Sequence, residues 1–208
     1  GKTLGKFYNE NRTPVKYEDL AQNLVDAVVA TEDRRFYEHS GIDMRGTARA
    51  VAFLGSKGGA STITQQLAKL LFSDTPSSKF ERVLQKVKEW IIATRLESQY
   101  TKEEIITMYL NKQDFLFQAV GIRSASKIYF DKEPIDLRPE ESAIIAGMLK
   151  NPRQYNPYRE ISKDKSLERR NTVLALMAET GKITEAERDS LIAMPMEIKF
   201  SPEGHADG

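Results

Sequence analysis

Residues 30–41 read Ala-Thr-Glu-Asp-Arg-Arg-Phe-Tyr-Glu-His-Ser-Gly, and here an apolar helical stretch changes into a dense group of charged and aromatic side chains. The preceding residues, 17–29, repeat apolar side chains at the spacing of a buried helix face. Glu32 is therefore expected to emerge from a packed helix. A carboxyl group held there is partly desolvated, which raises its pKa toward the range useful for proton transfer.

A charge cluster at a helix end is more often a solvated surface, because exposed ion pairs are common and contribute only about 0 to 1 kcal/mol. In this chain Phe36, Tyr37 and His39 interleave with the charges, and Gly41 ends the run. That mixture favours a cleft wall over a solubilising face.

Length and composition bound the protein class. A chain of 208 residues suits one domain, or one domain with a minor lobe. Its 31 basic and 30 acidic side chains nearly cancel, so no global field selects nucleic acid as a partner. The absence of cysteine excludes disulfides and thiol catalysis. No apolar run approaches the roughly 20 residues that span a bilayer, and we expect a membrane anchor to precede residue 1.

Helical periodicity and capping signals recur along nearly the whole chain. Only residues 197–200 alternate like a strand, so the predicted class is mainly α. The expected helices are 17–30, 43–55, one starting at 62, 79–97, 101–111, 120–130, 139–150, 162–180 and 184–193.

Two of these helices carry long apolar stripes. In the 79–97 helix the stripe is expected to be buried, and its members are Phe80, Val83, Leu84, Val87, Trp90, Ile91 and Thr94. In residues 44–54 the apolar surface favours core packing. The alternative there is a face that dips into a lipid surface.

Residues 58–69 form a glycine-containing loop that leads into a helix. Thr62 and Gln65 fit a capping box at its start. A helix N-terminus attracts anions through its unpaired N–H groups and its dipole, and Lys69 lies about two turns further on. An ordinary capped helix is the alternative, and the loop lacks the Gly-Lys-Ser/Thr of a Walker loop.

Glu89 is the second carboxyl group of interest, because Lys86 and Gln85 precede it at helix-neighbour spacing. An exposed ion pair is again the simpler interpretation. If Glu32 and Glu89 face one cleft, however, that cleft also holds several cations. A glycosidase that expels an alcohol needs an acid, whereas a departing diphosphate needs positive charge. The cations therefore favour a diphosphate donor, with one Glu free to deprotonate an attacking hydroxyl.

In this order the motifs resemble those of the peptidoglycan glycosyltransferases, glycosyltransferase family 51, over about residues 17–158. The motifs are Glu32-Asp33-x-x-Phe36-x-x-His39-x-Gly41, Gly59-Ala60-Ser61-Thr62-Ile63-Thr64-Gln65-Gln66, Lys86-x-x-Glu89, Lys102-x-x-Ile105-x-x-x-Tyr109-Leu110-Asn111 and Ala125-x-x-Tyr129-Phe130.

The resemblance implies a lysozyme-like helical head lobe with a small membrane-associating jaw lobe at about residues 42–57. It implies polymerisation of lipid II into β-1,4-linked glycan, with inversion and release of undecaprenyl diphosphate. Glu32 then takes the proton of the acceptor hydroxyl, and Glu89 orients the sugar or the cations around the diphosphate. The implied substrate-binding residues are Asp33, Phe36 and His39 around Glu32, Ser61, Thr62 and Gln66 in the donor site, and Lys69 and Lys86 on the diphosphate.

The resemblance also sets expectations about cofactors, partners and place in the cell. A divalent cation, Mg²⁺ or Mn²⁺, is expected to bridge the substrate diphosphate, with no metal cluster in the protein itself and no organic cofactor. Expected partners are lipid II, the growing glycan strand, a membrane surface and other cell-wall synthesis proteins, at the outer face of the bacterial cytoplasmic membrane. Residues 1–16 are expected to follow a single-pass anchor, 17–195 to form the transferase domain, and 196–208 to begin a linker to the transpeptidase of a class A penicillin-binding protein.

The chain departs from the family at two donor-site positions, where Gln85 replaces a usual Arg and Leu70 a usual Asn. Arg82 and Lys88 are the two candidates to replace the missing cation. The loop 112–119 also lacks a glycine that the family often has. Two other functions remain open: a lysozyme-like hydrolase with Glu32 as acid, and an inactive cell-wall scaffold that binds the donor mimic moenomycin without turnover.

Overall fold

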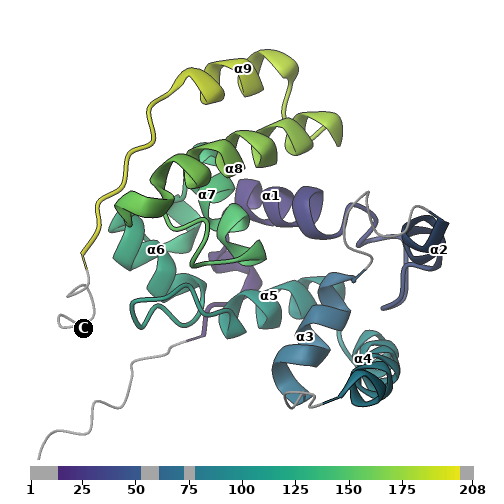
Figure 1. Cartoon of the computed structure of the whole chain (residues 1–208). Coiled ribbons are helices and arrows are strands. Elements are labelled where there is room, and N and C mark those ends of the chain that lie inside the picture. The colour runs from purple at the N-terminus through teal and green to yellow at the C-terminus, as the bar shows by residue number, and fades with distance from the viewer. Residues whose placement is uncertain (1–13, 53–60, 73–77, 202–208) are drawn as a thin grey trace, which may run out of the picture.

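The protein was examined as a computed structural model, which describes residues 14–52, 61–72 and 78–201. These residues are mainly helical, as predicted, and form no β-sheet (Figure 1). The elements are η1 Tyr17–Asp19, α1 Gln22–Glu32, α2 Met44–Ala52, α3 Ile63–Phe72, α4 Lys79–Gln99, α5 Lys102–Lys112, α6 Ile122–Phe130, η2 Pro134–Asp136, α7 Pro139–Lys150, α8 Glu160–Glu179 and α9 Glu185–Ala193.

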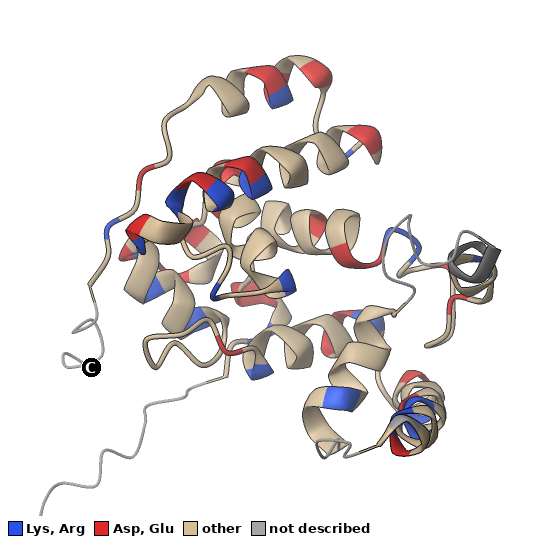
Figure 2. Ribbon diagram, viewed as in Figure 1, with Lys and Arg blue, Asp and Glu red and all other residues tan. Residues whose placement is uncertain are grey.

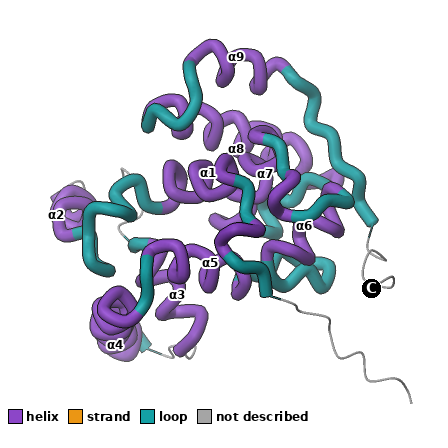
Figure 3. The backbone as a smooth tube through the Cα atoms, turned by 180° about the vertical axis from the view of Figure 1, so that it is seen from behind, coloured by secondary structure: helices purple, strands orange, loops and turns teal. Residues whose placement is uncertain are grey.

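Helix α1 runs through the middle of the helical body and ends at the site (Figures 1 and 3). It packs against α7 and α8, and its buried residues include Leu24, Val28 and Ala30. A helix that is buried on most of its faces must be apolar nearly all round, which is what residues 24–30 provide. Its last residue, Glu32, is therefore held by a rigid element.

Helices α2 and α4 lie at the edge of the molecule, outside the body formed by α1 and α5–α8 (Figures 1 and 3). Helix α3 connects α4 to that body, because it packs against both α4 and α5. Residues 53–57 of the expected jaw, like residues 1–13, 58–60 and 202–208, lie outside the described residues.

The apolar stripe of α4 is not buried, and that prediction was wrong. Phe80 is 71% exposed and Val83 62% exposed, and Leu84, Val87 and Ile91 are exposed as well. Helical periodicity shows which side chains share a face, but it does not show whether another element covers that face. Met44 of α2 is also exposed, against the expectation of core packing.

The helix starts predicted from capping signals are confirmed. Thr62 and Gln65 cap α3 reciprocally, since Gln65 N donates to Thr62 Oγ1 (3.1 Å) and Thr62 N donates to Gln65 Oε1 (3.2 Å). Thr101 and Glu104 form the same motif on α5. Asp43 accepts from Gly46 N at 2.8 Å at the start of α2. The first helix begins at Gln22, later than predicted, and a 3₁₀ turn precedes it.

The predicted strand at 197–200 does not form, because no partner strand lies beside it among the described residues. The segment is extended and its N–H groups bond to the end of α6: Lys199 N to Tyr129 O (2.9 Å) and Ser201 N to Ile128 O (2.8 Å). Phe200 stacks on Tyr158 with ring centroids 3.6 Å apart. The C-terminal segment is thus packed along the body.

The loop between α5 and α6 shows the consequence of its missing glycine. Leu116, Phe117 and Gln118 have φ values of 69°, 50° and 65°, a left-handed conformation that costs a non-glycine residue about 1 to 2 kcal/mol. Phe117 packs edge-on against Phe200 at 5.1 Å between centroids. Tertiary packing therefore holds a backbone that the local sequence disfavours.

None of the helices within the described residues is long and apolar enough to cross a membrane.

Candidate active site

Glu32 is oriented by a hydrogen-bonded chain of three side chains from three helices. Tyr109 on α5 donates its hydroxyl to Gln66 Oε1 (2.9 Å), and Gln66 on α3 donates its Nε2 to Glu32 Oε2 (3.1 Å). The phenol and the carboxylate together fix which way the amide of Gln66 points. Glu32 thus receives a single directed donor and keeps its other oxygen for a proton.

The environment of Glu32 raises its affinity for a proton. Burial raises the pKa of Glu32 above its ordinary value of 4.5, and the charge of Asp33 adds to that rise. The hydrogen bond from Gln66 and the positive charges of Arg169 and Lys150 act in the opposite direction without cancelling it. A carboxylate with a raised pKa is a stronger proton acceptor, so Glu32 can take a proton from a hydroxyl group.

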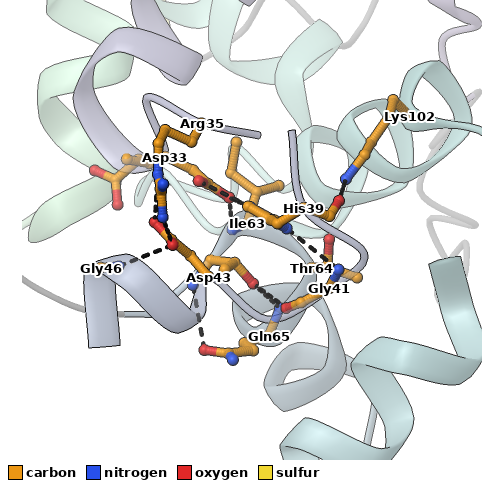
Figure 4. Close-up of polar contacts among 12 residues, drawn as sticks. Asp33, Arg35, His39, Gly41, Asp43, Gly46, Ile63, Thr64, Gln65 and Lys102 are labelled. Atoms are coloured by element: carbon orange, nitrogen blue, oxygen red, sulfur yellow. Dashed lines mark hydrogen bonds and ion pairs between the residues drawn. The ribbon is translucent and has the colours of Figure 1, made fainter. Parts of the chain in front are cut away.

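Asp33, the next residue, connects the end of α1 to the start of α3 (Figure 4). Its carboxylate accepts from Ile63 N (3.1 Å), and His39 Nε2 lies 2.9 and 3.0 Å from its two oxygens. Gly41 N points at His39 Nδ1 (3.2 Å), so the hydrogen-bond network places the imidazole proton on Nε2, where it is donated to Asp33. Asp33 and His39 are almost fully buried, and their role is to hold the end of α1 against α3.

Three N–H groups at the start of α3, where the sequence suggested an anion site, already have acceptors within the protein. The anion there is the carboxylate of Asp33, bonded to Ile63 N, while Gln65 N and Gln66 N bond to Thr62. A helix N-terminus binds an anion through free N–H groups, and these donors are already taken. These three donors are therefore not available to a phosphate group, which leaves side chains as its main partners.

Phe36 is fully buried behind the site, with Lys102 Nζ 4.5 Å from its ring centroid. Lys102 in turn donates to His39 O (2.7 Å) and pairs with Glu97 (2.8 Å). These contacts brace the segment that follows Glu32.

A pocket of about 600 Å³ opens between α3 and α4. Its lining is polar, and three of its four charged side chains are basic: Ser61, Gln65, Gln66, Lys69, Arg82, Gln85, Lys86 and Glu89. Figure 2 shows the basic segments of α3 and α4 close together at the edge of the molecule, while the end of α1 is acidic. Gln66 belongs to the pocket wall and also bonds Glu32, so it joins the pocket to Glu32.

Within the pocket, Lys86 is fixed and Glu89 is neutralised. Lys86 Nζ donates to Ser61 Oγ (2.7 Å) and to Glu89 Oε2 (2.9 Å). Glu89 is only 6% exposed, so this is a partly desolvated ion pair rather than the exposed one that spacing alone favoured. Lys69 pairs with no acid within the described part of the chain, and its charge is available to a ligand.

The structure brings most of the predicted site residues together. Five of them line the pocket: Ser61, Gln66, Lys69, Lys86 and Glu89. Glu32 lies beside the pocket, joined to it by Gln66. The other four, Asp33, Phe36, His39 and Thr62, form the buried support behind it.

Sequence reasoning missed several neighbours of Glu32 and of the pocket. Arg169 and Lys150 act on Glu32 from α8 and α7, more than a hundred residues away in the chain, and no local pattern announces them. Tyr109 was noted only as part of a motif. Of the two candidates to replace the cation missing at Gln85, Arg82 lines the pocket and Lys88 does not.

Within the described residues no group of three or more His, Asp or Glu side chains could hold a metal ion by itself. Glu89 is the single carboxylate of the pocket and already pairs with Lys86.

Comparison with known proteins agrees with this geometry. The transglycosylase family matches residues 1–178. Penicillin-binding protein 1A of Vibrio cholerae is 41% identical over 204 residues, covering 96% of this chain and 24% of the relative. Penicillin-binding protein 1F of Bacillus subtilis is 42% identical over 191 residues, covering 90% and 26%. The crystal structure of penicillin-binding protein 1A from Haemophilus influenzae superposes with a TM-score of 0.53 at 26% identity, covering 90% of this chain and 18% of that one.

This chain spans about a quarter of the length of the curated relatives that it matches. The family match covers Glu32, the residues that support it and all the residues that line the pocket. The chain therefore belongs to the transglycosylase family.

Proposed function

We propose that this domain is a peptidoglycan glycosyltransferase that polymerises lipid II into β-1,4-linked glycan with release of undecaprenyl diphosphate. One observation carries the proposal: Gln66 bonds the base Glu32 and also lines a pocket whose cations exceed its acids. A proton acceptor and a site for an anionic leaving group are thus adjacent, as transfer from a diphosphate donor requires.

In the proposed reaction the 4-hydroxyl of the acceptor sugar attacks the anomeric carbon of the donor. The new C–O bond forms on the face opposite the breaking bond to the diphosphate, which gives inversion. Glu32 accepts the hydroxyl proton, and the diphosphate leaves with the bonding electron pair. Lys69 and Lys86 stabilise the charge that grows on the leaving group, and Glu89 keeps Lys86 in place.

A divalent cation fits this pocket only together with substrate, since Glu89 is the one carboxylate that lines it. Mg²⁺ binds through one or two carboxylates plus substrate phosphates, so Glu89 and the diphosphate are its proposed ligands. When bound, the ion would neutralise part of the phosphate charge.

The exposed face of α4 supports binding to a lipid surface. The apolar stripe from Phe80 to Ile91 lies on the helix that also lines the diphosphate pocket, so a lipid tail attached to the diphosphate would start beside that stripe. The proposed location is the outer face of the cytoplasmic membrane, near other cell-wall synthesis proteins.

Vesicle flotation tests the lipid surface. Replacing Val83 and Val87 by serine is expected to reduce binding to anionic phospholipid vesicles several-fold. Ile161, which is 83% exposed on α8, supplies the matched control, because Ile161→Ser removes a comparable apolar side chain from the body. Equal losses in both variants would count against the proposal.

The central experiment gives the protein lipid II and Mg²⁺ and resolves the products on a gel. We expect polymer from the wild type and none from Glu32→Gln, which keeps an acceptor for the Gln66 hydrogen bond but cannot take a proton. A hydrolase would instead release reducing ends from finished peptidoglycan and make no polymer. A scaffold would bind moenomycin without turnover.

A further inference from the structure

The pocket contains more positive charge than its own acid can balance, and the surplus is divided between two helices. Lys86 is matched by Glu89 at 2.9 Å. The remaining cations of the lining are Lys69 on α3 and Arg82 on α4. Neither of them pairs with a carboxylate in the described residues.

We infer that Arg82 is a substrate-binding residue, which holds the diphosphate of the donor from the side opposite Lys69. This inference rests on the proposed function, since it assigns a residue to the same pocket. A diphosphate esterified at both ends carries two negative charges, and Lys69 and Arg82 supply two unpaired positive charges. The guanidinium group adds a planar fork of donors that matches phosphate oxygens in pairs.

The helix geometry explains how Arg82 reaches the pocket. Residues 82, 85, 86 and 89 follow the i, i+3, i+4, i+7 spacing, so they form one face of α4, and all four line the pocket. Gln85 on this face is neutral. Arg82 lies one turn before it and supplies the charge that Gln85 lacks. Lys88 carries the same charge as Arg82 but lies on another face of the helix, outside the lining.

Arg82 is exposed and bonds to no described residue, so its replacement should leave the fold intact. Its contribution is expected to grow during the reaction, because the departing diphosphate gains a further negative charge. Replacing a side chain of this kind is expected to change the affinity for the ligand and not the stability of the fold. This difference distinguishes a binding role from a structural one.

The test measures binding of farnesyl diphosphate, a short lipid diphosphate, by titration calorimetry. Arg82→Gln is expected to weaken binding roughly 10- to 100-fold, because it removes a charge-assisted hydrogen bond to a phosphate oxygen. Lys88→Gln, the matched control on the same helix, is expected to stay within about twofold of the wild type. The double variant Arg82→Gln with Gln85→Arg returns a guanidinium to the same face and is expected to recover most of the affinity. Farnesyl monophosphate should respond less to Arg82→Gln.

Equal weakening by Arg82→Gln and Lys88→Gln would overturn the inference, because it would reduce the effect to the net charge of α4. Unchanged affinity in Arg82→Gln would overturn it as well. Thermal unfolding of each variant confirms that the fold is retained. A wild type that binds farnesyl diphosphate through Arg82 but makes no polymer from lipid II would sink the proposed function and leave this inference standing. Polymerisation at full rate by Arg82→Gln would overturn this inference and leave the proposed function standing.

Discussion

Replacing Asp33 by alanine removes the group that fastens the end of α1 to the start of α3. The carboxylate is bonded to Ile63 N at 3.1 Å and to His39 Nε2 at 2.9 Å, and all of these groups are buried. Alanine leaves both donors without an acceptor and without access to water. Leaving a buried donor unsatisfied costs about 1 to 3 kcal/mol, so the two donors together cost roughly 2 to 6 kcal/mol.

That loss is a large share of the roughly 5 to 15 kcal/mol that stabilises a typical domain. In a protein of this size 1 kcal/mol shifts the unfolding midpoint by about 2 to 4 °C, so Asp33→Ala is expected to lower it by roughly 4 to 24 °C. Activity should fall further than the folded fraction, because Asp33 also positions Glu32 relative to Gln66.

Thermal unfolding followed by circular dichroism measures the shift. Glu179→Gln is the control, because it breaks the surface pair with Arg34, whose side chains are 44% and 60% exposed. An exposed pair contributes at most about 1 kcal/mol, so its midpoint should move by no more than about 4 °C. If the two variants shift equally, the assignment of Asp33 as a buried anchor is wrong.

Three further predictions concern the base and the backbone. Since the pKa of Glu32 is raised and the proposed base must be ionised, the polymerisation rate should increase with pH through that pKa. The charge of Arg169 lowers the pKa of Glu32, so Arg169→Met should move this increase to higher pH. An unchanged pH–rate profile would contradict the role of Arg169. The raised pKa of Glu32 in the folded protein also means that its ionised form destabilises the fold, so stability is lost as the pH rises through that pKa. Unfolding midpoints should therefore show Glu32→Gln to be more stable than the wild type at pH 7 and equal to it near pH 4. Equal midpoints at pH 7 would refute this. Gly121→Ala should lower the urea midpoint of unfolding, because φ at this residue is 86° and a Cβ would lie 3.0 Å from Asn111 O. Gln118→Gly should raise the stability by about 1 kcal/mol, because glycine adopts the left-handed conformation of this residue without strain. Changes of the opposite sign would show that neither backbone position is strained.

Local signals in the sequence were enough to predict the helices and much of the site. Capping boxes depend on residues three apart, and the Thr62–Gln65 box predicted at the start of α3 is confirmed for that reason. The Lys86–Glu89 pair was likewise visible as an i, i+3 spacing. The exposure of the α4 stripe could not be predicted, because a buried apolar helix face and a solvent-exposed one have the same periodicity.

The sequence by itself determined where the helices begin, which side chains share a face, and that two carboxyl groups accompany a set of cations. Only the tertiary structure decided that Gln66 joins Glu32 to the pocket, that Asp33 occupies the start of α3, and that Arg82 rather than Lys88 faces the pocket. The physical reason is how far apart in the sequence the interacting residues lie. Caps and helix faces arise from neighbours within about four residues, whereas Glu32 and Gln66 are 34 residues apart and Asp33 and Ile63 are 30 apart, so packing of the helices must bring them together.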